Sequence, residues 1–163
     1  MRWCRKLAEQ GNSFGQWVLG QMYENGKVVP RDYKAAARWF SQAAAQGDSE
    51  GQRWLGVMYY RGHGVLQDYK ETVRWYRLAA EQGNAQAQNN LGEMYRQGEG
   101  VPQDYVLAYM WKNIAAASAD DDERSQIIFA GFRDIAAIDM NQKQIAEAQE
   151  LARKCTANKF KGC

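Results

Sequence analysis

Residues 73–105 read VRWYRLAAEQGNAQAQNNLGEMYRQGEGVPQDY, and most of this pattern returns when the chain is shifted by 36 residues. Residues of the same type come back at fixed places along the chain. The repeated positions are Gly11/Gly47/Gly83, Gln16/Gln52/Gln88, Leu19/Leu55/Leu91, Gly20/Gly56/Gly92, Tyr23/Tyr59/Tyr95, Asp32/Asp68/Asp104 and Trp39/Trp75/Trp111. Self-similarity at such a period is typical of arrays of short supersecondary units. The chain is therefore a repeat protein.

The capping and loop residues of one period predict a helix-turn-helix. Asn84 is an N-cap residue, whose side chain accepts a hydrogen bond from the unpaired amides of a first helix. That helix runs to about the repeated tyrosine, and a glycine-rich loop, residues 98–102, follows it. Asp104 then begins a second helix, which the next glycine closes. Asn12 and Asp48 give the same signal in the two earlier periods.

The apolar spacing predicts how these helices are stabilised. Each helix has an apolar stripe at helical spacing, and one helix pair cannot bury both stripes, so neighbouring pairs must stack. We expect an all-α protein, an α-solenoid of stacked helix-turn-helix repeats with a C-terminal pair of capping helices. The expected segments are a half-repeat at 1–11, repeats at 12–47, 48–83 and 84–119, capping helices at 120–155 and a tail at 156–163.

Three repeated features predict details of the packing. Glycine inside a helix costs about 1 kcal/mol relative to alanine, so Gly20, Gly56 and Gly92 indicate close approach of the second helix of each pair. The Trp39/Trp75/Trp111 column is interpreted as core, with Tyr95 also buried; a row that stacks on ligands is the alternative. Repeat 1 has Lys27-Val28 where repeat 3 has Glu99-Gly100, so its loop should take a different turn.

The two ends depart from the repeat. Residues 1–11 align with 73–83, so the chain starts halfway through a repeat; we expect an artificial or alternative start of a longer protein, with a natural half-repeat as the alternative. Asp120, Asp121, Asp122 and Glu123 favour a helix start, a metal site being the alternative. The stretch that follows is an amphipathic helix, which should close the stack together with a last helix at 145–153. Its apolar face includes Ile127, Ile128, Gly131, Phe132, Ile135 and Ile138.

The cysteines indicate which cellular compartment the protein occupies. Cys155 and Cys163 enclose a short polar segment, and a disulfide there would stabilise by about 2–3 kcal/mol. Two free thiols are the alternative. A disulfide would imply an oxidising compartment such as the periplasm. Cys4 takes a place that is aromatic in Phe40 and Tyr76, which favours a buried, inert thiol.

Several function classes find no support in the sequence. The three cysteines and the single histidine, His63, lack zinc-ligand spacing, and His63 is interpreted as a solvated loop residue with no nucleophile beside it. Walker-type phosphate loops are absent, so we expect neither an enzyme nor a bound cofactor or metal. No apolar run approaches the ~18 residues of a membrane span, so no membrane insertion is expected. Lys+Arg 21 against Asp+Glu 19 gives a net charge of +2, which disfavours nucleic acid.

The repeat resembles that of the Sel-one-like repeat (SLR) family, a relative of tetratricopeptide repeats with a slightly longer unit. The resemblance rests on residues 75–83, WYRLAAEQG, on 83–92, GNAQAQNNLG, and on 98–105, GEGVPQDY, and it covers residues 1 to about 118. It implies an adaptor or scaffold that binds a protein or peptide on the concave face formed by the first helices of the pairs. It also implies a bacterial, periplasmic or secreted protein, whose export signal is absent from this fragment; a cytoplasmic protein is the alternative.

The outward column of the first helices supplies the candidate binding residues. They are Phe14, Trp17, Gln21, Glu50, Arg53, Val57, Tyr60, Asn89, Glu93 and Arg96. Acidic residues match basic ones in this column, which favours a protein-binding scaffold over the alternative, a helical repeat that reads single-stranded nucleic acid. The aromatic residues Phe14, Trp17 and Tyr60 predict that repeats 1 and 2 bind a partner more strongly than repeat 3. Phe14 and Trp17 could instead pack against a missing upstream repeat.

Overall fold

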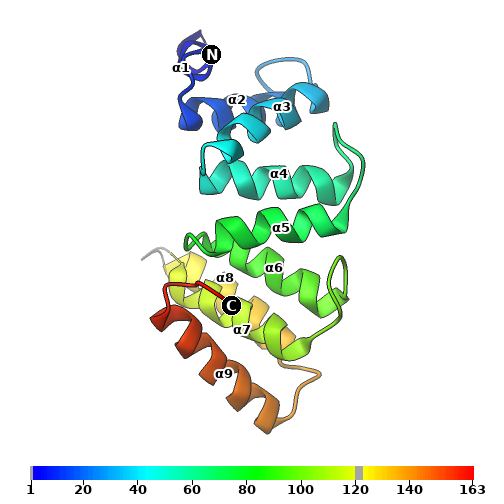
Figure 1. The fold of residues 1–163 in the computed structure, drawn as a ribbon, viewed down its shortest axis with the longest axis vertical. Helices are drawn as coiled ribbons and strands as arrows, with labels where there is room; N and C mark the ends of the chain where they lie inside the picture. Colours follow the sequence, from blue (N-terminus) through cyan, green and yellow to red (C-terminus); the bar gives the residue numbers. More distant parts are fainter. Residues whose placement is uncertain (1, 120–122) are drawn as a thin grey trace. The chain divides into compact units, whose positions relative to one another are not determined.

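The computed structural model describes residues 2–119 and 123–163, and within them the chain forms nine helices and no strand (Figure 1). The helices are α1 (Arg2–Glu9), α2 (Ser13–Asn25), α3 (Tyr33–Ala45), α4 (Ser49–Arg61), α5 (Tyr69–Ala80), α6 (Ala85–Gln97), α7 (Tyr105–Ser118), α8 (Glu123–Ala136) and α9 (Gln142–Ala157). The predicted all-helical architecture is confirmed. Asp120, Asp121 and Asp122, predicted to begin the capping helices, lie outside the described residues.

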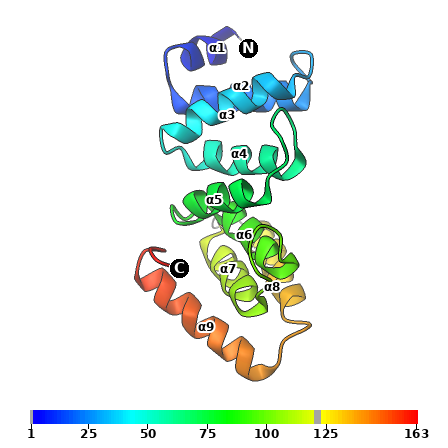
Figure 2. The same cartoon turned by 45° about the vertical axis from the view of Figure 1, so that its right-hand side comes forward.

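The chain divides into two compact units, Met1–Trp75 and Tyr76–Cys163, with the boundary inside α5. In the first unit, α2 packs against both α1 and α3, and α3 packs against α4. In the second unit, α6 packs against α7, and α7 in turn packs against α8 and α9. Figure 2 shows α7 between these last two helices. Each unit is therefore a stack of neighbouring helices, as the repeat pattern requires.

The predicted helix boundaries hold at the first residues and shift slightly at the last. Asn84 Oδ1 accepts from the Ala87 N–H at 2.9 Å, and Asn12 and Asp48 cap α2 and α4 in the same way. These three helices end two residues later than predicted because a left-handed glycine follows each of them. The three glycines are Gly26, Gly62 and Gly98, with φ between 67° and 72°.

The loop of repeat 1 differs from the others as predicted. Gly64 and Gly100 adopt φ values of 74° and 72° in the loops of repeats 2 and 3. Val28 takes the place of these glycines, and among the described non-glycine residues only Lys159 and Phe160 have positive φ. A β-branched residue avoids the left-handed region, so the loop of repeat 1 takes another path.

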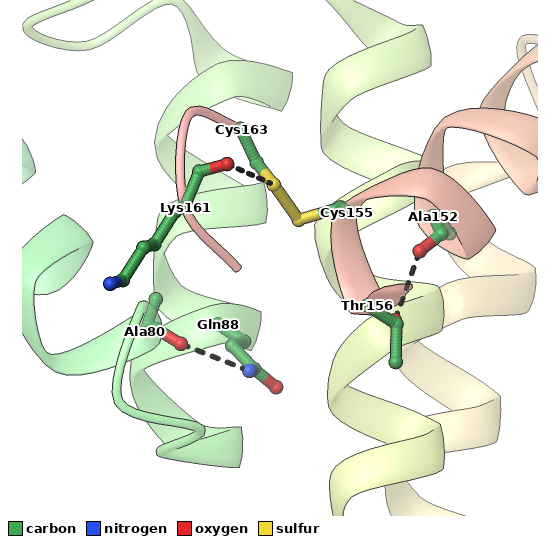
Figure 3. Close-up of a disulfide and its surroundings, with 7 residues drawn as sticks. All are labelled: Ala80, Gln88, Ala152, Cys155, Thr156, Lys161 and Cys163. Atoms are coloured by element: carbon green, nitrogen blue, oxygen red, sulfur yellow. Dashed lines mark hydrogen bonds between the residues drawn. A yellow bond between two sulfur atoms is a disulfide. The ribbon is translucent and has the colours of Figure 1, made fainter. Parts of the chain in front are cut away.

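The glutamine column seals the junction between consecutive helices. Gln88 Nε2 donates to the carbonyl oxygen of Ala80 at 3.1 Å, in the last turn of the preceding helix (Figure 3). Gln16 and Gln52 make the equivalent bonds to Ala8 and Ala44 at 3.3 and 3.5 Å. Each of these carbonyl oxygens also accepts from the turn amide three residues later, Gly83 N–H in the case of Ala80, so the buried glutamine supplies its second hydrogen bond. This explains why a polar residue recurs in the core.

The close packing predicted at the helical glycines is confirmed at Gly20 and Gly92. A Cβ on Gly20 would lie 2.7 Å from the ring of Phe40 in α3. A Cβ on Gly92 would lie 2.9 Å from both the carbonyl oxygen of Ala108 and the side chain of Lys112 in α7. Helix contact at these points leaves no room for a side chain, which offsets the poor helix propensity of glycine.

The tryptophan column is only partly buried. Trp111 is 0% exposed and Tyr95 is 7% exposed, as predicted. The prediction is wrong for Trp39 and Trp75, which are half-buried. Trp75 Nε1 donates to Glu71 Oε2 at 3.1 Å at the surface. The half-buried position lets the Trp75 indole N–H reach this carboxylate while its ring still packs, whereas the fully buried Trp111 Nε1 has no hydrogen-bond partner among the described residues.

The C-terminal helices do not bury the apolar face that was expected to close the stack. Within α8, Ile127, Ile128, Phe132 and Ile135 are 65%, 46%, 40% and 57% exposed, and Ile138 just beyond it is 76% exposed. α8 packs on α7 through its other side, where Ala136 is buried. α9 contacts α7 as well, so both C-terminal helices pack on α7 while this apolar face of α8 stays exposed.

Candidate protein-binding surface

The ten candidate residues fall in both units. Seven lie on α2 and α4 in the first unit, and Asn89, Glu93 and Arg96 lie on α6 in the second. Within the first unit α2 and α4 touch each other, so their candidate residues belong to one local surface. The residues on α6 form a separate local cluster, described below.

An aromatic pair marks the start of α2. Phe14 is 51% exposed, and its ring meets that of Trp17 edge-on with centroids 5.3 Å apart. Trp17 is half-buried and packs against the core of the first unit, which holds the pair in place. Gln21 follows one turn later and is also half-buried. Exposed aromatic rings on a rigid helix are common anchors in protein interfaces.

Two candidates on α4 are not exposed as predicted. Arg53 is 8% exposed and Val57 is 9% exposed. The Arg53 guanidinium lies 4.5 Å from the centre of the Trp54 ring and donates to Glu50 Oε2 at 2.7 Å. Because an Arg side chain has a long apolar stem and a stackable head, α4 buries it against its own neighbours. Arg53 and Val57 therefore lie beneath the exposed candidate residues and support them.

The remaining candidates on α4 stay accessible. Tyr60 is half-buried, with its ring centroid 5.5 Å from that of Tyr69. The backbone carbonyl of Tyr60 accepts from Gln67 Nε2 at 2.8 Å, which fixes the end of α4 to the following loop. Glu50, also half-buried, holds Arg53. On the first unit, the candidate residues that keep solvent-accessible area are thus Phe14, Trp17, Gln21, Glu50 and Tyr60.

The candidates on α6 are organised by a buried lysine. Lys112 of α7 is 4% exposed, and its ammonium lies 3.0 Å from Glu93 Oε2 and 3.4 Å from Asn89 Oδ1. Arg96 binds the same carboxylate, with Nη2 2.5 Å from Glu93 Oε1. Phe132 of α8 covers the cluster, its ring centre 5.6 Å from Lys112 Nζ.

This environment fixes the charge of the carboxylate. Burial raises the pKa of Glu93, but hydrogen bonds from Arg96 and Lys112 outweigh burial and lower that pKa from 4.5 to about 2. The hydrogen bond to Glu93 likewise raises the pKa of Arg96 above its ordinary value. Glu93 therefore stays ionised at any physiological pH and neutralises one of its two cations.

Sequence reasoning missed Lys112, although the sequence contained a signal. Lys112 stands 36 residues after Tyr76 and 72 after Phe40, in a column that is otherwise aromatic. In the same repeat, Glu93 replaces Val57 and Gln21 in the facing column. A cation and an anion that replace uncharged residues in one repeat predict a salt bridge between them.

A recess lies at the loop edge of the first unit. Its volume is about 620 Å³, it opens widely to solvent, and its lining includes Tyr23, Arg31, Tyr33 and Lys34. His63 was predicted to be a solvated loop residue, but it is half-buried and stacks on Tyr33 with ring centroids 4.0 Å apart. Gly64, next to it, approaches the Tyr33 carbonyl so closely that a side chain would clash.

The predicted cysteine pair is within bonding distance. The sulfur atoms of Cys155 and Cys163 are 2.05 Å apart and their Cα atoms 5.7 Å apart, so the bridge ties the tail back to α9 (Figure 3). A small cavity of about 180 Å³ lies beside it, between α7 and the tail. Cys4 is a free thiol and is half-buried rather than buried, because α1 packs on α2 with only one side.

Residues 2–119 and 123–163 contain neither a membrane-spanning helix nor a metal-binding cluster. In this part of the chain, no helix is both long and apolar enough to cross a membrane. No group of three or more His, Cys, Asp or Glu side chains in the same ranges is placed to hold a metal ion.

The Sel1 repeat family model matches residues 1–12, 13–48, 49–84 and 85–120. The chain belongs to the Sel1 repeat family. Each repeat boundary in this match lies one residue after the expected one. The match ends at residue 120, before α8 and α9. No curated protein sequence matches the chain.

Solved structures of Sel1 repeat proteins from bacteria are similar to this chain. One is c5321, a protective antigen present in uropathogenic Escherichia coli strains that displays an SLR fold, with a TM-score of 0.69 and 30% identity over 98% of this chain and 42% of that one. Another is a Sel1 repeat protein from Oxalobacter formigenes, with a TM-score of 0.64 and 34% identity over 78% and 95% of the two chains. Cysteine rich protein B from Helicobacter pylori shares the fold, with a TM-score of 0.59 and 21% identity over 78% and 90%.

These similarities concern the fold class of the chain and the share of its relatives' length that it spans. The chain spans 42% of the length of the Escherichia coli antigen. The predicted helical-solenoid class is confirmed by the shared fold. Sel1 repeat proteins are generally protein-interaction scaffolds and are not typically enzymes.

Proposed function

We propose that this Sel1 repeat chain binds a protein or peptide segment on the α2–α4 surface of its first unit. The observation that carries the proposal is the Phe14–Trp17 pair, an exposed ring braced by a half-buried one. Tyr60 adds a third aromatic ring from α4. Aromatic side chains on rigid helices lose little conformational entropy on binding, so each ring can contribute strongly to affinity.

The chemistry of the surface suits an apolar segment with polar flanks. Phe14 and Tyr60 supply apolar area, while Gln21 and Glu50 supply hydrogen-bonding groups beside them. Arg53 and Val57 support these residues from below, since both are buried. The aromatic pair could also contact a further repeat that precedes it, and the experiment below distinguishes the two roles by measuring binding.

The cations of the candidate column do not suit nucleic acid. The guanidinium of Arg53 is engaged by Glu50 and Trp54, and that of Arg96 is engaged by Glu93. Lys112 is buried. A groove that follows a phosphate backbone needs exposed, unneutralised cations in a row. A protein partner therefore fits this column better than single-stranded nucleic acid.

We also infer a periplasmic or secreted location, because the Cys155–Cys163 geometry suits a disulfide. Disulfides persist in oxidising compartments and are rare in the cytoplasm. Intact-mass measurement of native material with and without reductant tests this inference. Two alkylatable thiols at these positions would instead indicate a cytoplasmic protein.

The binding proposal can be tested with peptides selected on the intact chain. Peptides from a random displayed library are enriched on the immobilised chain, and one selected peptide is labelled with fluorescein for polarisation titrations. Combined Phe14→Ala and Tyr60→Ala should weaken its binding by about 1–4 kcal/mol in total. Leu66→Ala is the matched control, since Leu66 is an apolar loop residue that is 91% exposed.

The outcomes distinguish two locations of the site and a different class of ligand. Weaker binding with unchanged circular dichroism supports the α2–α4 surface. If Lys34→Ala, at the loop recess, weakens binding and the aromatic substitutions do not, the site lies at that edge instead. Tight binding of a labelled oligouridine at ~150 mM salt would favour the nucleic-acid alternative, because screening removes weak electrostatic contacts at that salt.

A further inference from the structure

The recess at the loop edge of the first unit, called here the loop recess, has no role in the proposed function. Its volume of about 620 Å³ is in the range of pockets that hold a small ligand or a few side chains. Tyr23 near the end of α2 and Tyr33 at the start of α3 line it. Gly64, from the loop after α4, approaches the Tyr33 carbonyl and lines it as well. The loop recess is thus built by three segments of one compact unit.

Three cationic side chains surround the loop recess. Arg31 Nη1 donates to the hydroxyl of Tyr33 at 3.4 Å. Arg5 Nη2 of α1 donates to the hydroxyl of Tyr23, also at 3.4 Å. Lys34, in the first turn of α3, is exposed and lines the recess directly. Two guanidinium groups and one ammonium group therefore lie around a recess that has two phenol hydroxyls in its walls.

The acidic residues of this region do not neutralise these cations through direct contact. Asp32 also lines the loop recess, but its carboxylate accepts from the Ala35 N–H at 2.9 Å as the N-cap of α3. Glu24, near the end of α2, pairs with Arg61 at 3.2 Å. Within the described ranges 2–119 and 123–163, the three cations around the recess form no ion pair with a carboxylate. Their charge is therefore available to a ligand.

The positive charge is specific to the first of the three equivalent loops. Residues 26–35 have a net charge of +2, whereas the equivalent residues 62–71 and 98–107 have net charges of −1 and −2, with His63 neutral. The charged residues are Lys27, Arg31, Asp32 and Lys34 in the first loop, Asp68, Lys70 and Glu71 in the second, and Glu99 and Asp104 in the third. The repeat pattern itself therefore does not require the cations.

The local structure does not require the charge of Arg31 either. Gln67 and Gln103 take its place in the next two repeats. Each donates to a carbonyl oxygen at the end of the preceding helix, at 2.8 and 2.9 Å, and to a tyrosine hydroxyl, at 3.3 and 3.1 Å. Arg31 makes bonds of the same type, to the Asn25 carbonyl and the Tyr33 hydroxyl. A neutral amide can hold this loop, so the charge of Arg31 is additional.

We propose that the loop recess is a second binding site, which takes an acidic peptide segment of a protein partner. Guanidinium groups hold carboxylates through paired, charge-assisted hydrogen bonds, and an ammonium group adds a point charge. Each of the two tyrosine hydroxyls accepts from an arginine and keeps its own proton to donate. The site goes beyond the α2–α4 surface and uses none of its residues, so the two proposals can fail separately.

A nucleic acid or a sulfated polysaccharide suits the loop recess less well. Such polymers carry charge at regular intervals and bind along a row of cations. The equivalent loops of repeats 2 and 3 are net negative, so the repeats do not continue the row. A short acidic peptide segment needs only the charge around one loop.

Titration of the intact chain with a rhodamine-labelled hexaglutamate peptide tests the proposal, read as fluorescence polarisation at about 20 mM salt. Hexaglutamate should bind about tenfold or more tightly than hexaglutamine. Arg31→Gln combined with Lys34→Gln should weaken hexaglutamate binding about tenfold or more, since it removes two cations while glutamine already serves at residue 31's place in the other repeats. The control, Lys143→Gln with Lys159→Gln, removes the same charge from two exposed residues of the second unit and should change binding less than about twofold.

Circular dichroism confirms that each variant is folded. Phe14→Ala with Tyr60→Ala, which tests the α2–α4 surface, should leave hexaglutamate binding unchanged; a loss there would overturn the assignment to a separate site. Equal affinity for hexaglutamine, or equal weakening in the recess and control variants, would also overturn the proposal, because net charge alone would then explain the binding. So would heparin or oligouridine that binds more tightly than hexaglutamate at about 150 mM salt and depends on Arg31 and Lys34.

Discussion

Glu93→Gln is the substitution that tests most sharply how the second unit is held together. It removes the negative charge that Lys112 faces at 3.0 Å while keeping nearly the same shape. Lys112 has a side chain only 5% exposed, so water cannot replace the lost counterion well. Removing one member of a buried ion pair costs about 3–5 kcal/mol, because the other charge stays buried and unpaired.

The value expected here is smaller for two structural reasons. The Glu93 side chain is 33% exposed, so solvent screens part of the interaction. Lys112 also keeps Asn89 Oδ1 at 3.4 Å and the ring of Phe132. We therefore expect Glu93→Gln to lower the free energy of unfolding by about 1.5–3 kcal/mol. Lys112→Met should cost less than about 1 kcal/mol, since Arg96 still neutralises Glu93 and methionine fills the buried space.

The assay is a double-mutant cycle, with unfolding in urea at neutral pH followed by circular dichroism. In the double variant the loss caused by Glu93→Gln should largely disappear, which gives a coupling energy of about 1–2.5 kcal/mol. Glu150→Gln is the control, because it removes an ion pair of 2.6 Å to Arg153 from the exposed face of α9 and should leave the unfolding midpoint unchanged. A coupling energy below about 0.5 kcal/mol would refute the buried-pair account.

The same pair has a defined pH dependence. The pKa of Glu93 is about 2 in the folded chain and 4.5 when unperturbed, so its contribution to stability is fully present above pH 4.5. It is lost as the pH falls from 4.5 towards 2, because the unfolded state then binds the proton more readily. The unfolding curves of wild type and Glu93→Gln should therefore differ at neutral pH and converge near pH 2.

Four substitutions and one chemical treatment test the packing, and each is measured as a change in the free energy of unfolding. Trp111→Ala should cost about 3–5 kcal/mol because Trp111 is fully buried, and Trp75→Ala clearly less because Trp75 is half-buried. Gly92→Ala should cost about 1–3 kcal/mol, since its Cβ would lie 2.9 Å from the Ala108 carbonyl. Gly131→Ala should stabilise the folded chain by up to about 1 kcal/mol, since its Cβ meets open space. Reducing the Cys155–Cys163 bridge, whose ends are 8 residues apart, should cost about 2–3 kcal/mol.

The sequence predicted the parts of the fold that depend on local signals. The N-cap residues and the left-handed glycines act through backbone hydrogen bonds within a few residues, so the pattern around Asn84 and Gly98 defined α6 to within two residues. Gly20 and Gly92 were also interpretable, because a costly residue at a fixed place must be offset by contact. Such signals need no knowledge of distant residues.

The candidate surface was less predictable because exposure depends on tertiary neighbours. Spacing placed Arg53 on the same side of α4 as Tyr60, but it could not show that the Trp54 ring, stacked on Phe40 at 5.5 Å, offers the guanidinium a flat apolar support. The same gap hid Lys112, whose burial depends on a helix after the last repeat, through Phe132. Periodicity specifies which face a residue occupies, not what covers that face.

The helical glycines carry this reasoning one step further, to α8. In the repeats, Gly20 and Gly92 each meet the second helix of their own pair, α3 and α7. The helix that follows α8 is α9, and it packs on α7. Gly131 therefore has the local signature of a helix contact without the contact. Because a Cβ on Gly131 would meet open space, this glycine lowers the helix propensity of α8 without the close contact that offsets the same cost at Gly20 and Gly92.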